Sequence, residues 1–314
     1  PLAHEFHRAV RGTPRIIRKL LGTYHLLEMP EEWNQHAFDH HVHDASTKGR
    51  KNPTHLVMDA WVKGIRFLTV IYYNTVDSDV AQELLRAARI MGITVRIGIE
   101  FKASLGGKFV EFIWSPLNTE SPKYFAELSH RSDIATVLGE YAVVNDWMRN
   151  HLLELLRNWN AIHAPELALQ WGFASLPALK EEDFFTYMGQ RQPSALHLAE
   201  YICQEWLPLV QQQCSAAIKM AVAAESQESV KQLNVVQEFL GGLVPDDVLE
   251  TWLTPAANPE LVFPKQPDSR LPAVMLNPPE LLLERLVPLH PCQMVLNLAG
   301  LTAQDVLELL WRGR

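Results

Sequence analysis

Short apolar runs alternate with helical repeats of apolar residues along the first third of the chain. The runs are rich in β-branched and aromatic side chains, which is typical of buried strands, and they occupy residues 36–43, 65–73 and 93–99. Between them, apolar residues recur every three or four positions over residues 53–63 and 78–91, as on one face of a helix. This strand–helix–strand–helix–strand order predicts parallel strands in an α/β sheet or barrel.

Capping residues mark the ends of the two predicted helices. Asn52 is an N-cap residue and is followed by Pro53, which is favoured at the first helical position. Asp77 or the serine after it starts the second helix. Gly64 and Gly92 follow the two helices, where glycine supplies the left-handed conformation of a C-terminal cap.

The rest of the chain changes character twice. Residues 108–114 predict a fourth strand, and from about 121 to 252 the pattern is helix after helix. Residues 254–272 are proline-rich and predict a loop or linker. Short apolar segments then predict a strand, a helix, a strand and a helix at residues 273–276, 279–286, 291–298 and 303–311. We therefore expect β/α units to resume at the C-terminus, with the helical block inserted in an α/β domain.

Four segments follow from this pattern. Residues 1–35 predict a basic helical segment, for which a solvated helix packed on its apolar side is favoured over a polyanion-binding face. Residues 36–120 and 253–314 carry the α/β domain, and residues 121–252 the helical insertion. The chain begins with Pro1 rather than methionine and ends directly after a helical pattern. We therefore expect a domain excised from a longer protein, whose other domains are its partners.

Composition and charge exclude several classes of protein. The 314 residues are 47% hydrophobic and 20% charged, which is typical of a globular protein with a sizeable core. The net charge of −8 argues against a nucleic-acid ligand, and no apolar run is long enough to span a membrane. Three scattered cysteines favour a reducing compartment, so we expect a cytoplasmic protein.

The first strand carries the most informative polar residues. Asp39 precedes His41 and His43, and residues two apart on a strand share a face. Two neutral imidazoles on one face are the start of a metal site, although isolated H-x-H pairs are more often plain surface histidines. Tyr73 and Glu100 are predicted at the ends of the next two strands, at the same rim of the sheet. Three segments thus deliver polar groups to one place.

These residues resemble the polymerase and histidinol phosphatase superfamily, called the PHP domain. The segment from Phe38 to His43 resembles its first motif, an acid followed by H-x-H. Gly49 and Asn52-Pro53 resemble the residues before the family's first helix, and Gly98-Ile99-Glu100 resembles its third motif. The dense part of the match covers residues 36–101. The resemblance implies a distorted (β/α) barrel with a large all-helical insertion, divalent metals at the strand ends, and hydrolysis of phosphate esters.

The same resemblance implies a reduced metal site. The ligands would be His41, His43 and Glu100, with His290 as an outside candidate for a later motif, and the metal Mn²⁺, Zn²⁺ or Fe²⁺. The family's second motif contains an acid and a ligand histidine, but residues 71–74 here read Ile-Tyr-Tyr-Asn. Tyrosine is a poor ligand at neutral pH. Three ligands could hold one metal with an open position but not the family's full cluster.

Two functions remain open at this stage. The first is a metal-dependent phosphoesterase-like hydrolase acting on a phosphorylated small molecule or a phosphodiester. Asp39 would orient a ligand histidine and Tyr73 would donate a hydrogen bond to substrate. A cationic loop could hold the phosphate, and its residues are Lys48, Arg50 and Lys51. The second is a catalytically inactive PHP-like scaffold or interaction module of a larger protein, favoured by the loss of several ligand positions together.

Overall fold

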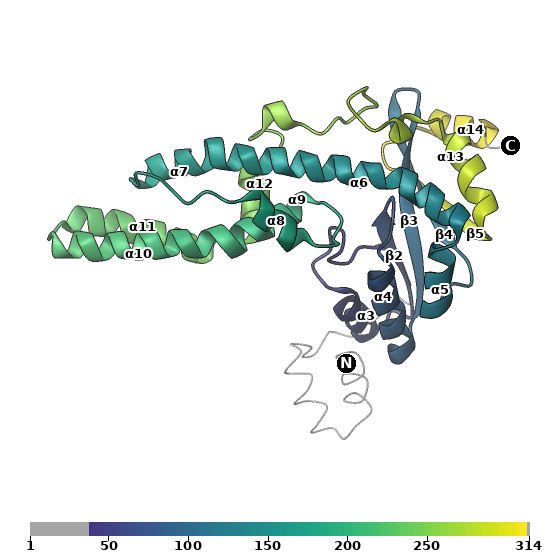
Figure 1. Cartoon of the computed structure of the whole chain (residues 1–314), viewed down its shortest axis with the longest axis horizontal. Helices are drawn as coiled ribbons and strands as arrows, with labels where there is room; N and C mark the ends of the chain where they lie inside the picture. The colour runs from purple at the N-terminus through teal and green to yellow at the C-terminus, as the bar shows by residue number, and fades with distance from the viewer. Residues whose placement is uncertain (1–37, 313–314) are drawn as a thin grey trace, which may run out of the picture. The chain divides into compact units, whose positions relative to one another are not determined.

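The computed structural model describes residues 38–312, which divide into two compact units. The described part of the first unit comprises residues 38–145 and 264–312, and the second unit comprises residues 146–263. Figure 1 shows the first as a sheet with helices and the second as an all-helical body. The predicted basic helix at residues 1–35 lies outside the described residues. No helix within residues 38–312 has the length and apolar character needed to cross a membrane.

A five-stranded sheet forms the centre of the first unit, with its strands in sequence order. The strands are β1 (Phe38–Val42), β2 (Phe67–Tyr73), β3 (Thr94–Leu105), β4 (Lys108–Pro116) and β5 (Cys292–Asn297). The first three are parallel, as the alternating pattern predicted, whereas β4 is antiparallel to both β3 and β5. The fold is therefore mixed α/β with a half-barrel sheet, and the described strands do not close into a full barrel.

The third strand is longer than the sequence predicted. It was expected to end at Glu100, but β3 continues for five residues and turns back through Gly106 and Gly107 into β4. Both glycines have positive φ angles, 55° and 80°, which a two-residue hairpin of this kind requires. Glu100 is nevertheless level with the end of β2, because it is the register partner of Tyr73.

Helices cover one face of the sheet. They are α3 (Pro53–Val62), α4 (Ser78–Met91), α5 (Pro122–Ser129), the first part of α6 (Ser132–Asn158), α13 (Pro279–Leu286) and α14 (Ala303–Arg312). Odd-numbered residues of β3, from Val95 to Leu105, face these helices in two hydrophobic clusters. The predicted caps are confirmed, since the Asn52 side chain accepts from the amide of His55, Asp77 caps α4, and Gly92 ends it in the left-handed conformation.

The opposite face of the sheet carries the polar residues of the strands. Alternation puts Arg96, Glu100 and Lys102 of β3 on this face, together with Tyr73 of β2. Lys102 forms a 3.0 Å ion pair with Glu111 of β4, its register partner. His41 of β1 and Tyr73 of β2 therefore lie on the face away from the helices. The prediction that Asp39 shares this face is wrong, because Asp39 is the register partner of Leu68 in the core and the strand pairing shifts between Asp39 and Val42.

The second unit is a bundle built from the end of α6 onward. Its helices are η2 (Trp159–His163), α7 (Ala164–Trp171), α8 (Glu181–Met188), α9 (Ala195–Tyr201), η3 (Ile202–Trp206), α10 (Leu207–Ala223), α11 (Gln227–Gly242), α12 (Pro245–Trp252) and η4 (Pro259–Leu261). Both η2 and η3 are π-helical turns inside longer helices, and their fully buried residues Trp159 and Trp206 pack edge to face at 5.1 Å. The hydrophobic core of this unit includes Leu152, Leu155 and Leu156 of α6 and Trp159 of η2.

Two parts of the C-terminal prediction are wrong. Residues 273–276 were expected to be a strand but form the 3-10 helix η5 (Ala273–Leu276), because Pro272 precedes them and Met275 donates its amide hydrogen to the carbonyl of Pro272. A further 3-10 turn, η6 (Val287–Leu289), precedes β5. The strand predicted near residues 291–298 is present as β5, but it pairs antiparallel with β4 and so does not resume the parallel β/α pattern.

Candidate functional site

The two histidines of the first strand form a close pair. Their Nε2 atoms are 3.2 Å apart, and their rings are nearly perpendicular with centroids 5.1 Å apart. His41 is exposed near the end of β1, and His43 is half-buried one residue beyond it. The Nδ1 of His43 is 3.0 Å from the carbonyl oxygen of Ile71 and can only donate to it. This bond assigns the proton to Nδ1 and leaves the Nε2 of neutral His43 with a lone pair.

A tight loop after β1 fixes the position of His43. The carbonyl of Asp44 accepts from the amides of Thr47 and Gly49, at 3.1 and 2.8 Å. A Cβ atom on Gly49 would lie 2.1 Å from the carbonyl oxygen of His43, so only glycine fits. The Thr47 hydroxyl is 3.3 Å from Nδ1 of His43. The loop therefore fixes both the backbone position of His43 and the orientation of its imidazole ring.

Tyr73 and Lys48 complete the group around the pair. The ring of Tyr73 stacks on His43 with centroids 5.2 Å apart, and its hydroxyl is 3.4 Å from Nε2 of His43. The ammonium group of Lys48 lies over the Tyr73 ring, 5.4 Å from its centroid. Because strand residues alternate between faces, Tyr72 points into the helical core while Tyr73 points to this site. The predicted proximity of His41, His43 and Tyr73 is what the structure shows.

Burial and nearby charges shift the pKa values of these groups. Burial lowers the pKa of His43 to about 4, with further lowering by Lys48 and His41. The pKa of His41 is lowered by burial and then by Lys48. Both imidazoles are therefore neutral at pH 7, which is the form that binds metals. Burial, followed by repulsion from Glu100, raises the pKa of Tyr73, so its hydroxyl stays protonated and can donate a hydrogen bond.

Glu100 occupies the adjacent position on the next strand. It is 5% exposed, and burial followed by repulsion from Glu111 raises the pKa of its carboxyl group to about 7. Lys102 and Lys48 act in the opposite direction. Glu111 also raises the pKa of His41, so its charge reaches the histidine pair. The sequence analysis did not single out Glu111, because an isolated acidic residue within a predicted strand does not show which neighbouring strand it faces.

The other predicted site residues lie in different surroundings. Asp39 accepts from the amide of His41 at 3.2 Å rather than from an imidazole. Lys51 is tied to Asp59 of α3 by a 2.6 Å ion pair, whereas Arg50 is exposed. His290 is 3.1 Å from the carbonyl oxygen of Leu117, to which its Nε2 donates. Of the three loop cations, the structure brings Lys48 to the pair.

A buried acid next to the pair was also missed by the sequence. Asp44 is 0% exposed, and its carboxylate accepts from the Tyr72 hydroxyl at 2.7 Å and from the amide of Ser46 at 2.8 Å. Burial raises the pKa of this carboxyl group against the lowering effect of the Tyr72 hydrogen bond. Asp44 directly follows the histidine motif, which could have drawn attention to it. Its hydrogen-bond partner Tyr72, however, is 28 residues away in the chain.

The histidine pair passes one test as a metal site and fails another. Two imidazole nitrogens bound to one ion at about 2.1 Å lie roughly 3.0–3.4 Å apart at coordination angles of about 90–110°. The observed 3.2 Å fits that range, and the bond from His43 to the Ile71 carbonyl is the support that a ligand histidine usually has. However, no three His, Cys, Asp or Glu side chains within residues 38–312 are grouped closely enough to hold a metal ion.

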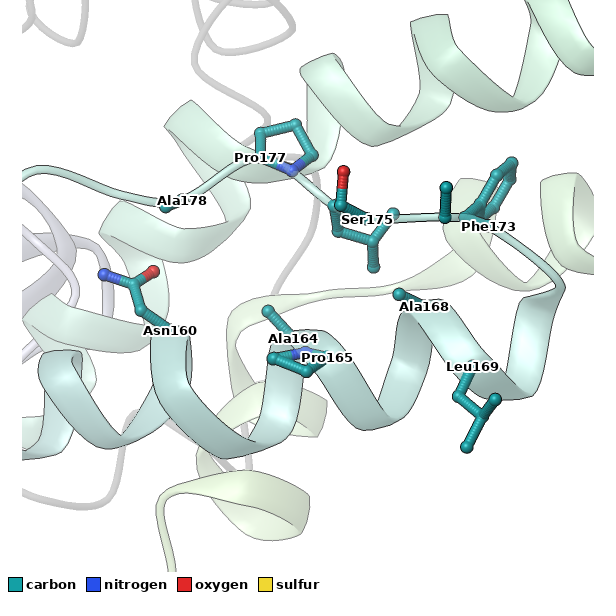
Figure 2. Close-up of a pocket in the computed structure, with 11 residues that line it drawn as sticks. Asn160, Ala164, Pro165, Ala168, Leu169, Phe173, Ser175, Pro177 and Ala178 are labelled. Atoms are coloured by element: carbon teal, nitrogen blue, oxygen red, sulfur yellow. The ribbon is translucent and has the colours of Figure 1, made fainter.

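A separate pocket of about 220 Å³ lies within the helical unit (Figure 2). It is lined by residues of η2, of α7 and of the extended segment after α7. The side chain of Asn160 pairs with the backbone of Leu179, with distances of 2.8 and 2.9 Å, so its amide is used in holding this segment. None of the residues predicted for the site lines this pocket.

Comparisons with known proteins place the fold. No family model and no curated protein sequence matches the chain. A candidate metal-dependent phosphoesterase from Bifidobacterium adolescentis has a similar structure, with a TM-score of 0.53 and 12% identity over 91% of this chain and 76% of that one. An amidohydrolase from Chromobacterium violaceum, with bound sulfate and no metal, has a TM-score of 0.46 and 15% identity over 88% and 74%. The first likeness shows a shared fold.

Proposed function

We propose that this chain is a metal-dependent phosphoesterase-like hydrolase of the PHP type with a reduced metal site, in which His41 and His43 hold one divalent ion. The observation that carries the proposal is the 3.2 Å separation of their Nε2 atoms, with the Nδ1 of His43 engaged by the Ile71 carbonyl. Both imidazoles are neutral at pH 7 and so offer lone pairs. The shared fold with a candidate metal-dependent phosphoesterase supports the same reading.

The remaining groups suit a phosphate ester. A bound Mn²⁺, Zn²⁺ or Fe²⁺ would polarise a phosphoryl oxygen and lower the pKa of a water molecule. Lys48, above the Tyr73 ring, provides a cation for the phosphate charge. Tyr73 offers a protonated hydroxyl next to His43 for a substrate oxygen. The substrate class is a phosphorylated small molecule or a phosphodiester, and the net charge of −8 argues against nucleic acid.

The proposed ligand set is narrower than the sequence implied. His41 and His43 remain, whereas Glu100 and His290 do not form a three-residue group with them in the described chain. Oxygen atoms of water and substrate would complete the coordination of the ion. Glu100, as the register partner of Tyr73, is close enough to influence the charge of the site, and Asp39 positions the backbone of His41.

Metal binding tests this proposal directly. Protein purified without chelator is analysed for bound metal, and Mn²⁺ and Zn²⁺ are titrated by calorimetry into the wild type and into His41→Ala and His43→Ala. His40→Ala is the matched control, because His40 lies in the same strand but its nearest ring contacts are Phe38 and Phe67. We expect each variant of the pair to lose about 10-fold or more in affinity and His40→Ala to lose little. Equal affinity in all four proteins would contradict the site.

Hydrolysis of an aryl phosphate with added Mn²⁺ distinguishes the enzyme from the alternative. That alternative is an inactive PHP-like scaffold or interaction module of a larger protein. It is favoured by Tyr72, which lies where the resemblance places the acid of the second motif and instead donates a buried hydrogen bond to Asp44. Metal binding without hydrolysis of aryl phosphates or of a bis-aryl phosphodiester would support the scaffold, whereas hydrolysis lost in His43→Ala and kept in His40→Ala supports the enzyme.

A further inference from the structure

One face of helix α11 combines exposed apolar and charged residues in an ordered stripe. Figure 1 shows α10 and α11 side by side as a helical hairpin of the second unit. Helix α11 packs against the core of the second unit through Leu233, Val236 and Leu240. The opposite face carries Lys231, Val235 and Glu238, which are spaced four and three residues apart and are all exposed. This spacing places them in one row along the helix.

The apolar residue of this stripe is unusually accessible. Val235 is 68% exposed, whereas Phe239, one turn further, lies off the stripe and is in ring contact with Trp171 at 5.9 Å. A single exposed apolar residue needs no explanation, but here Val235 lies between two charged residues of opposite sign on a helix whose other face is packed. A central apolar residue with a charged rim is the general arrangement of a protein–protein contact.

The charges of the stripe are self-complementary about its centre. Lys231 and Glu238 are each three and a half residues, or about 5 Å along the axis, from the midpoint between Asn234 and Val235. Two such helices related by a two-fold axis through this midpoint run antiparallel. Lys231 of each copy then faces Glu238 of the other, and the two Val235 side chains meet at the axis. In a parallel pair, like charges would face each other.

We propose that α11 is a dimerisation surface on which two copies of this chain pair through antiparallel α11 helices. The residues that set the register are Lys231, Val235 and Glu238. Lys231 and Glu238 lie seven residues apart, about 10 Å along the helix, so they do not neutralise each other within one copy. No ion pair among the described residues involves either of them. An isologous contact of this kind uses the same patch twice, so each charge pair occurs twice.

Charge reversal tests the proposal, because two single variants should weaken the dimer and the double variant should restore it. The association of the whole chain is measured by sedimentation equilibrium from roughly 1 to 300 µM, the range in which small interfaces associate. Lys231→Glu and Glu238→Lys each replace two attractive pairs with two repulsive ones, and we expect each to weaken the dimer about 10-fold or more. The double variant restores both pairs with the signs exchanged, so its dissociation constant should return to within about threefold of the wild type.

Two controls make the outcome decisive. Lys123→Glu changes the same charge on α5, where the lysine side chain is 88% exposed, and should leave association unchanged. Far-UV circular dichroism of each variant shows whether α11 remains folded, and Val235→Asp adds a variant that breaks the contact at the axis without altering the charge pairs. A wild type that stays monomeric throughout the range would overturn the proposal. So would single reversals that leave the dimer intact, or a double variant no better than the single ones.

Discussion

The hydroxyl group of Tyr72 donates a 2.7 Å hydrogen bond to the carboxylate of Asp44 inside the first unit, where both residues are at most 1% exposed. This bond joins the loop that follows the histidine strand to the neighbouring strand β2. It lies on the core side of the sheet, whereas Tyr73 lies against His43 on the other side. Of these two adjacent tyrosines, Tyr72 therefore belongs to the core and Tyr73 to the candidate site.

Tyr72→Phe is expected to destabilise the protein by about 1–3 kcal/mol, because Asp44 would lose a hydrogen-bond donor in a place that water does not reach. Chemical denaturation followed by tryptophan fluorescence measures the change. Tyr124→Phe is the control, since Tyr124 is 41% exposed and removal of its hydroxyl should change stability by less than about 0.5 kcal/mol. Equal effects of the two substitutions would show that the buried bond contributes little.

Gly49→Ala is expected to disturb the histidine pair as well as stability. The new Cβ would lie 2.1 Å from the carbonyl oxygen of His43, and backbone rather than a flexible side chain would have to move. We expect a loss of about 1–3 kcal/mol together with displaced imidazole resonances of His41 and His43 in NMR spectra. Gly139→Ala, inside α6 with nothing within 4 Å of its Cβ position, should instead stabilise the helix. An unshifted histidine spectrum in Gly49→Ala would contradict the role given to the loop.

Acid should weaken the contact between the β3–β4 hairpin and α14. Hydrogen bonds from Lys108 and from Thr302 lower the pKa of Asp305 from 3.8 to about 2. Because the folded-state pKa is depressed, this carboxylate contributes stability above pH 4, and the contribution is lost as the pH falls from about 4 to about 2. Melting temperatures of wild type and Asp305→Asn should therefore differ at pH 6 and converge toward pH 2. Lys108→Met should show a similar convergence, and a constant difference at all pH values would exclude the linkage.

Trp159→Ala is expected to cost about 3–5 kcal/mol, because it removes a fully buried side chain and its ring contact between the two π-helical turns of the second unit. Trp159 is 0% exposed and packs on both Trp206 and Trp252. Trp311→Ala, on a residue that is 71% exposed, should change stability by about 0.5 kcal/mol or less. Thermal unfolding of the two variants compares them, and a small loss for Trp159→Ala would mean that the core refills the cavity.

The sequence alone determined the local features of this protein. Apolar periodicity predicted β1 to β4 and the helices between them, and the caps at Asn52, Asp77 and Gly92 are where the pattern put them. These features depend on neighbours in the chain, so they can be read from spacing and residue type. The meeting of parallel strand ends at one rim likewise predicted that His41, His43 and Tyr73 lie close together, whereas strand alternation wrongly put Asp39 on the same face.

Only the tertiary structure decided the directions of β4 and β5 and the detailed composition of the site. The antiparallel pairing of β4 with β5, the bond between Tyr72 and Asp44, and the position of Lys48 over Tyr73 join residues that are far apart in the chain. Such contacts follow from how helices and strands pack, and local spacing does not encode them. For the same reason, the sequence could propose Glu100 and His290 as ligands, whereas the fold holds His41 and His43 as the close pair.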